Sequence, residues 1–417
     1  MAASVTVLGA SGTITVPFKS QANALLAQQL ANYISTAIQS GSLYNPPYNS
    51  TSLPALPSVP GGTAFGEQVI GDDSATSVSG GNIQNPAGYP VIVDNASNPV
   101  TVTGAPIQVG PYGIEAGEGG LTFHGENSSL GGSIYLGGGN NVLDGVASGN
   151  SNPDWTNGGL IGNWIIGTGD DGTNSTTTSI RLALGNDQIN VGGNDSIATG
   201  GANAQIDVTS TASAKATVWL GMGNVTFYGG SESGDIVLGQ GIPTGDDLII
   251  GGTGGNSTLA AGSGNATLIG GGNNDIIFGS QSSTNQQLWA SGNTTLFGGG
   301  SSSDTFFGGS YLGSGNVLMS AAGSSGNNQF WAGSGNDSIW TGLGNDSVFV
   351  FADHTAHSGT APSDVVENYA PNDTVYLSDY ASWNFTNSGA GTVLNLSDGT
   401  QVTFAGITDP NTIKVVG

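Results

Sequence analysis

The sequence has no cysteine and very few basic residues, and both absences restrict what the protein can do. Without cysteine it can form neither disulfide bonds nor thiolate metal sites. The basic side chains number 4 against 29 Asp and Glu, so the formal net charge is −25. A chain without a basic stripe cannot displace counterions from phosphates or bind anionic lipid surfaces well. The charge therefore argues against nucleic acid and membrane surfaces as partners.

Long apolar runs are also absent from the sequence. No stretch of about 18 or more apolar residues occurs, so we expect no membrane span. The first residues, MAASVTVLGASG, contain neither the basic segment nor the apolar segment of a Sec-type signal peptide. If the protein is exported, we expect it to use another route.

The sequence contains few residue combinations that support catalysis. The three histidines are His124, His354 and His357, and no HExxH motif surrounds the pair that begins Asp353-His354. Adjacent carboxylates could suggest glycosidase chemistry. Each pair lies beside glycine, however, where turn geometry or calcium is a simpler explanation. These pairs are Asp72-Asp73, Asp170-Asp171 and Asp246-Asp247. No G-x-S-x-G motif has a partner histidine, and we expect no enzyme.

Apolar residues at helical spacing predict one amphipathic helix over residues 20–40. Leu26, Leu30 and Ile34 share one face, Ser20 can cap the first turn, and Gly41 can end the helix. We assign residues 1–62 to an N-terminal region that contains this helix and a connector rich in Pro, Ser and Asn. Residues 63–130 carry short β-type runs and form a β-rich segment whose fold and role the sequence leaves open.

Glycine is abundant, with 73 residues, and it recurs with a period of about nine between residues 131 and 350. The repeat unit is Gly-x-Gly-Asn-x-x-apolar-x. At the end of this array, Asn327, Asn336 and Asn345 lie nine apart. An apolar residue follows three positions after each of them, namely Phe330, Ile339 and Val348. Such a fixed period is the signature of a repeat architecture.

The period predicts an all-β fold, a parallel β-roll or β-solenoid. Glycine allows the positive φ needed where the chain turns, and the short strand that follows points alternate residues inward. Two nonapeptides make a coil of roughly 18 residues, and successive coils stack about 4.8 Å apart. We expect the asparagines to stack as ladders that satisfy backbone groups in the turns.

Two adjacent copies resemble the nonapeptide of repeats-in-toxin (RTX) proteins. They are GSGNDSIWT, residues 333–341, and GLGNDSVFV, residues 342–350; GGNNDIIF, residues 271–278, is a weaker copy. The resemblance covers roughly residues 160–417. It implies a β-roll in which the aspartate of each copy binds calcium together with turn carbonyls, in keeping with the preference of Ca²⁺ for several oxygen ligands.

The resemblance implies six calcium-binding side chains. Carried over by position, they are Asp337, Asp346, Asp275, Asp187, Asp195 and Asp247. Other copies carry a different residue at the ligand position, namely Ala266, Thr294, Val225, Val317 and Asn328. A substituted copy leaves half a site, so we expect fewer calcium ions than repeats.

Residues 351–417 are expected to form a β-rich C-terminal cap. Their order of short β runs, from DVVE at 364–367 to QVTFAGI at 401–407, resembles the segment that closes RTX arrays. In that family the segment carries an uncleaved signal for type I secretion. The resemblance therefore implies a secreted protein, located outside the cell or on its surface.

A row of aromatic residues is predicted on the outside of the array. The residue four positions after each ladder position should face outward. That position is repeatedly aromatic, with Tyr228 upstream and then Phe278, Trp289, Phe297, Phe307, Trp331, Trp340 and Phe349. Burial by wider coils or flanking domains would explain the row as well. If exposed, it favours an association surface.

Three functional hypotheses follow from these patterns. The first is a secreted calcium-binding structural protein that self-associates into a filament, a biofilm-matrix fibre or a surface layer, with copies of itself as partners. The second is an adhesin or a module that binds a cell-surface or matrix polysaccharide. The third, which has the least support, is a solenoid enzyme that acts on polysaccharides.

Overall fold

The computed structural model describes most of the chain in two compact units, Met1–Asn224 (unit 1) and Val225–Gly417 (unit 2). The described residues are 3–9, 12–18, 21–44, 58–59, 62–63, 65–70, 82–84, 89–104, 110–125, 130–145, 159–169, 177–209, 214–232, 234–239, 245–281, 285–309, 315–351 and 361–417.

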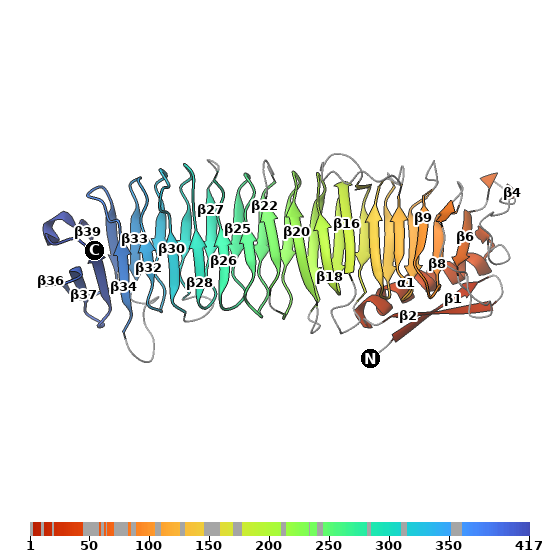
Figure 1. Cartoon of the computed structure of the whole chain (residues 1–417), viewed down its shortest axis with the longest axis horizontal. Helices are drawn as coiled ribbons and strands as arrows, with labels where there is room; N and C mark the ends of the chain where they lie inside the picture. Colours follow the sequence, from red (N-terminus) through yellow and green to blue (C-terminus); the bar gives the residue numbers. More distant parts are fainter. Residues whose placement is uncertain are drawn as a thin grey trace. The chain divides into compact units, whose positions relative to one another are not determined.

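Unit 1 contains two parallel sheets that the chain visits alternately (Figure 1). Sheet 1a is formed by β6 (Phe65–Ile70), β8 (Val91–Asp94), β10 (Tyr112–Ala116), β12 (Gly132–Leu136), β15 (Trp164–Gly167), β17 (Asn186–Val191) and β19 (Asn203–Val208). Sheet 1b is formed by β7 (Asn82–Gln84), β9 (Val100–Thr103), β11 (Leu121–His124), β13 (Asn140–Asp144), β16 (Thr177–Leu184), β18 (Asn194–Ala198) and β20 (Lys215–Leu220). Parallel coils therefore already occur within the β-rich segment at 63–130.

Three short elements complete the strands of unit 1. The strand β3 (Leu43–Tyr44) pairs with β6, and β14 (Leu160–Ile161) pairs with β16, both in parallel. The strands β4 (Ser58–Val59) and β5 (Gly62–Thr63) form an antiparallel pair within the expected connector.

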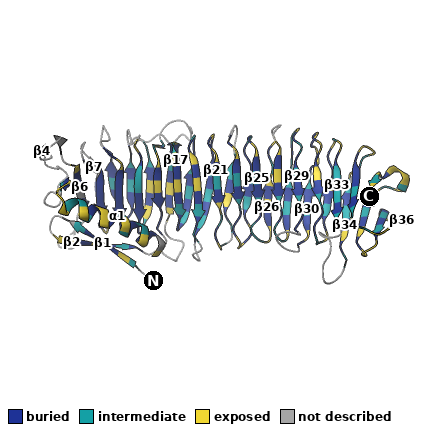
Figure 2. Ribbon diagram, turned by 180° about the vertical axis from the view of Figure 1, so that it is seen from behind, coloured by how far each residue is buried: buried dark blue, intermediate teal, exposed yellow. Residues whose placement is uncertain are grey.

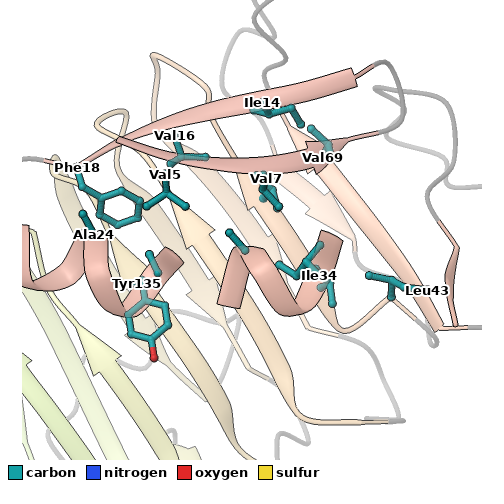
Figure 3. Packing of buried hydrophobic residues seen from close by; sticks show 14 residues of the cluster. Val5, Val7, Ile14, Val16, Phe18, Ala24, Ile34, Leu43, Val69 and Tyr135 are labelled. Carbon is teal, nitrogen blue, oxygen red and sulfur yellow. The ribbon is translucent and has the colours of Figure 1, made fainter. Parts of the chain in front are cut away.

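The outer face of sheet 1a is covered by a helix and a hairpin (Figure 3). The helix α1 (Gln21–Gln39) matches the predicted helix to within one residue at each end. An antiparallel hairpin, β1 (Ala3–Gly9) with β2 (Gly12–Phe18), packs over the helix. One apolar cluster joins Phe18 of the hairpin, Ile34 of α1, and Val93 of the sheet. The sequence did not predict this hairpin.

Unit 2 repeats the two-sheet coil. Sheet 2a is formed by β21 (Val225–Tyr228), β23 (Asp247–Ile250), β25 (Ala266–Ile269), β27 (Gln286–Trp289), β29 (Thr305–Phe307), β31 (Gln329–Trp331), β33 (Ser347–Phe351), β35 (Thr374–Ser378) and β39 (Val415–Val416). Sheet 2b is formed by β22 (Ile236–Gly239), β24 (Thr258–Ala260), β26 (Asp275–Phe278), β28 (Thr294–Phe297), β30 (Val317–Ser320), β32 (Ser338–Trp340) and β34 (Ser363–Glu367).

The core of unit 2 lies between its sheets and is formed by alternate residues of each strand. Burial alternates along strands such as β25, whose pattern runs buried, half-buried, buried, half-buried, and Figure 2 shows the buried residues repeating from strand to strand. In-register strands stack like residues, and the rings of Phe306 and Phe330 lie 4.7 Å apart and nearly parallel. The residue three positions after a ladder asparagine is buried, as predicted, at Phe330, Ile339 and Val348.

The C-terminal end of unit 2 is β-rich, as expected. The strand β38 (Gln401–Ala405) pairs in parallel with β34, and β37 (Gly391–Leu396) and β36 (Trp383–Ser388) add to it in an antiparallel meander. A short 3-10 helix, η1 (Pro410–Thr412), precedes β39. The fold is thus the predicted all-β parallel solenoid with one helix, continued by an antiparallel β segment. No helix among the described residues has the length and apolar content required to cross a bilayer.

Candidate functional site

The six aspartates predicted to bind calcium are all buried at the beginnings of strands. None is more than 6% exposed, although each carries a carboxyl group. Asp337, Asp275 and Asp195 belong to the column of sheet 1b or 2b, whereas Asp346, Asp247 and Asp187 belong to that of sheet 1a or 2a. Buried carboxyls need partners, and the turns supply them.

All six aspartates accept a backbone N–H from a neighbouring coil. Asp275, Asp337 and Asp346 also accept N–H groups of their own turns. One oxygen of Asp275 accepts the backbone N–H of Ser257, 18 residues earlier, at 2.8 Å. Its other oxygen accepts the N–H groups of Gly271 and Gly272 at 2.9 and 3.0 Å. Asp337 repeats this arrangement with Val317 and Gly333, at 3.0 and 2.8 Å. The glycine-rich turn thus points its N–H groups at the carboxyl that begins the next strand.

The register of the sheets decides which aspartates become neighbours. At the start of β26 and the strands after it, the column contains Asp275, Thr294 and Val317, and then Asp337 beside Asp364. The matching column of sheet 2a contains, in order, Gln286, Asp304, Asn328, Asp346 and Asp373. Asp346 and Asp373 are therefore neighbours. Among the described residues, these are the two places where aspartates occupy the same position in consecutive coils.

The two aspartate pairs concentrate negative charge in a buried place. The N–H of Asp337 donates to one oxygen of Asp364 at 2.9 Å, and the other oxygen of Asp364 is buried without a hydrogen-bond partner in the described part of the chain. Burial, reinforced by Asp337, holds the pKa of Asp364 well above its usual range. Burial also raises the pKa of Asp337 to about 6.

This chemistry fits a hard divalent cation. Burial raises the pKa of Asp373, and the charge of Asp346 adds to the effect. A bound dication would favour the ionised form of both pairs. Within the described residues no three His, Asp or Glu side chains lie close enough together to hold a metal ion by themselves. The remaining ligands would therefore be oxygens of the glycine turns or water, which Ca²⁺ accepts readily.

The other predicted ligands lack such a neighbour. Asp187 lies beside Ala204, and Asp195 lies beside Thr178 and Ala216. Asp247 lies beside Ala266. Burial raises the pKa of Asp187 and Asp247 to about 7 and that of Asp195 to about 6. These positions therefore have the buried carboxyl of the motif but not the paired arrangement.

Four buried aspartates at equivalent positions were not among the predicted ligands. They are Asp235, Asp304, Asp364 and Asp373. In Asp235 and Asp304 the preceding residue is glycine or serine rather than the ladder asparagine. A search for aspartate one or two residues before a short apolar run, as at Asp373 before Val375, would have found all four.

The predicted asparagine ladders are present. The N–H of Asn336 donates to Oδ1 of Asn316 at 2.9 Å, and the N–H of Asn316 donates to Oδ1 of Asn293 at 2.8 Å. A second ladder joins Asn345 to Asn327 at 2.9 Å. Each side chain thus satisfies a backbone donor in the turn of the next coil, which aligns the coils at the aspartate positions.

The predicted aromatic residues form two columns rather than one row. Trp289, Phe307, Trp331 and Phe349 align on sheet 2a, whereas Phe278, Phe297 and Trp340 belong to sheet 2b, with Ser320 between the last two. Two nonapeptides make one coil, so successive copies contribute to alternate sheets. Trp340 and Phe278 are 40% exposed, and the other five are half-buried.

Comparison with family models identifies the repeat. The model of the RTX calcium-binding nonapeptide repeat matches in four copies, within residues 251–282 and 321–349. The chain carries RTX calcium-binding repeats. RTX nonapeptides bind Ca²⁺, and they indicate a secreted calcium-binding protein of a class that is typically structural or toxin-like. The second matched range contains Asp337 and Asp346, and the first contains Asp275. No curated protein matches the chain.

Several residues weighed for catalysis or metal binding lie outside the described part of the chain. They are Asp72, Asp73, Asp170, Asp171, Asp353, His354 and His357. His124 is described, and its Nδ1 lies 2.5 Å from Oδ1 of Asp144 on the neighbouring strand.

Proposed function

We propose that this protein is a secreted calcium-binding structural protein that self-associates through the outer face of sheet 2a. Type I export would bring the chain outside the cell, where calcium at the paired aspartates joins neighbouring coils of unit 2. A filament, matrix fibre or surface layer is the kind of assembly that the proposal implies.

The observation that carries the proposal is a continuous apolar column on sheet 2a. We call it the apolar stripe: Tyr228, Ile250, Ile269, Trp289, Phe307, Trp331, Phe349, Tyr376 and Val416. Every member is at least partly exposed. A contiguous apolar surface of this kind typically marks an interaction site.

The rings of the stripe stack face to face along the sheet. Trp289 and Phe307 have ring centroids 3.7 Å apart, Trp331 and Phe349 4.7 Å, and Phe349 and Tyr376 4.9 Å, all with small interplanar angles. Stacking fixes the rotamers before any partner binds. A fixed aromatic surface loses little conformational entropy on association, which favours binding.

The neighbouring outward column on the same sheet is mostly polar. It contains Thr226, Leu248, Thr267, Gln287, Thr305, Gln329 and Ser347 and ends at the buried Thr374. An apolar stripe with an uncharged polar border is the arrangement of a protein interface, with an apolar core and a polar rim. A second copy presents the same two columns and no charge in either, so the stripes can meet despite the net charge of −25.

Calcium supports this surface indirectly. Asp346 and Asp373 lie at the starts of β33 and β35, whose outward residues include Phe349 and Tyr376 of the stripe. Ca²⁺ held there would neutralise the carboxyls and strengthen the contact between the two coils. The chain's own contribution is to bury the aspartates and to align the turns through the asparagine ladder.

The adhesin hypothesis remains the alternative, because aromatic residues can also bind sugars.

The proposal is tested with a variant in the middle of the stripe. Trp331→Gln with Phe349→Gln should leave the calcium-induced circular dichroism spectrum intact and abolish polymers in negative-stain images at about 1 mM calcium. Trp340→Gln on sheet 2b is the matched control and should still polymerise. A wild-type protein that stays monomeric with calcium would overturn the proposal, as would a stripe variant that assembles normally.

A further inference from the structure

The outer face of sheet 2b has a cavity that the stripe on sheet 2a does not explain. Its volume is about 540 Å³, within the range of small-ligand sites. Outward residues Ala260, Phe278 and Phe297 of three successive strands line one side. The turns that follow these strands supply the rest of the wall, including Ser263, Ser280 and Gln281.

The hollow exists because a small residue stands next to two large ones. Ala260 lies in register with Phe278, and Phe278 with Phe297. The two phenyl rings stack with centroids 5.2 Å apart and an interplanar angle of 13°. Phe278 is nevertheless 40% exposed. The alanine leaves space beside this exposed ring, so a flat ligand could lie against it.

The rest of the lining selects for a neutral ligand rich in hydroxyl groups. Two serines and one glutamine line the cavity together with the rings, and none of the described residues that line the cavity carries a charge. Gly239, Ala261, Gly262 and Gly279 complete the wall. Amide and hydroxyl groups can both donate and accept hydrogen bonds. A net charge of −25 disfavours acidic ligands.

We infer that the cavity beside Phe278 binds one ring of a neutral polysaccharide. The C–H face of a sugar ring would lie against the exposed phenyl ring, while its hydroxyls would meet Ser263, Ser280 and Gln281. This site is separate from the stripe and lies on the other sheet of unit 2. It would attach an assembled protein to a surrounding glycan, so the inference goes beyond self-association.

The experiment uses the full chain with calcium on an array of neutral and acidic oligosaccharides, followed by calorimetry with the strongest neutral binder. Phe278→Leu keeps an apolar side chain but removes the ring, and it should raise the dissociation constant at least tenfold. Ala260→Trp fills the hollow without removing any contact, and it should abolish binding. Trp340→Leu, on the same sheet but outside the cavity and the stripe, is the matched control and should bind as the wild type does.

Three results would overturn the inference. These are no binding to any neutral glycan, binding only to acidic glycans, or unchanged affinity in both Phe278→Leu and Ala260→Trp. Circular dichroism with calcium checks that each variant folds. If Phe278→Leu does not fold, Ala260→Trp still tests the inference. If these variants lose sugar binding but still form polymers, the cavity and the stripe are separate sites.

Discussion

Units 1 and 2 have the same coil but different outer surfaces. In both, the inward columns are aliphatic or aromatic and fully buried, as at Ile189 and Ile206 in unit 1 and at Leu288 and Phe306 in unit 2. In unit 1 the helix α1 and the hairpin cover the outside of sheet 1a, where Val93 is buried. In unit 2 the outward residues of sheet 2a form the stripe and remain partly exposed.

The two units also differ in where their buried acidic residues lie. Unit 2 pairs aspartates at the turns, where glycine N–H groups and a cation can compensate them. Unit 1 buries Glu67 and Glu115 on strands of sheet 1a, and none of their four carboxyl oxygens has a hydrogen-bond partner in the described residues. The coil therefore tolerates several kinds of outer residue, and the protein's interactions depend on those residues rather than on the core.

The largest expected effect is on calcium binding in unit 2. Changing Asp337, Asp364, Asp346 and Asp373 to Asn removes both pairs and should remove the calcium-dependent stability of this unit. Each site would contribute about 2.7 kcal/mol when calcium is at 100 times its dissociation constant. Native mass spectrometry counts the ions, and hydrogen exchange reports the two units separately.

The matched control for this variant is Asp187→Asn with Asp195→Asn. These aspartates are buried but have no aspartate beside them in their columns, so the change should not alter the ion count in unit 2. Equal ion counts in the quadruple variant and the wild type would remove the paired aspartates from the ligand set.

The next largest effect comes from comparing an inward and an outward residue of the strand β31. Phe330→Ala removes a fully buried ring and should reduce the free energy of unfolding by about 3–5 kcal/mol. Trp331→Ala, one residue later, removes an outward ring. Beyond the effect of the lost apolar area, the loss of stacking should reduce the free energy of unfolding by only about 0.5–1.5 kcal/mol. Chemical denaturation in calcium measures both, and equal losses would show that Trp331 belongs to the core.

The smallest effect concerns the buried glutamates of unit 1. Burial raises the pKa of Glu67 to about 8, and burial together with the charge of Glu67 raises that of Glu115 to about 8. Between about pH 4.5 and 8 the folded state keeps protons that the unfolded state releases, so the stability of the unit falls as the pH rises through this window.

Glu115→Gln should therefore stabilise unit 1 by ~1–3 kcal/mol at pH 9 and change little at pH 4. Thermal melting across this range measures the difference. Glu118→Gln, at an exposed position three residues away, is the control for the loss of a surface carboxylate. A Glu115→Gln advantage that is the same at both pH values would show that burial does not keep the carboxyl protonated.

Much of this organisation could be predicted from local pattern. Gly-x-Gly-Asn predicted the turn, the period of nine predicted the coil, and the apolar position three residues later predicted the core at Phe330. These predictions succeed because each repeat specifies its own turn and strand. Hairpin β1–β2 was missed, since no array pattern marks residues 3–18 and its burial depends on α1 and sheet 1a.

The sequence by itself determined the coil, the asparagine ladders and the aspartates that begin some of the strands, because these depend on contacts within one or two repeats. Only the tertiary structure decided which aspartates become neighbours, and it divided one expected row of aromatics between two sheets. The linked positions lie 18 residues apart at Asn328 and Asp346 but 27 apart at Asp337 and Asp364. Insertions change that separation without changing the register of the strands, so spacing in the sequence cannot identify the partner.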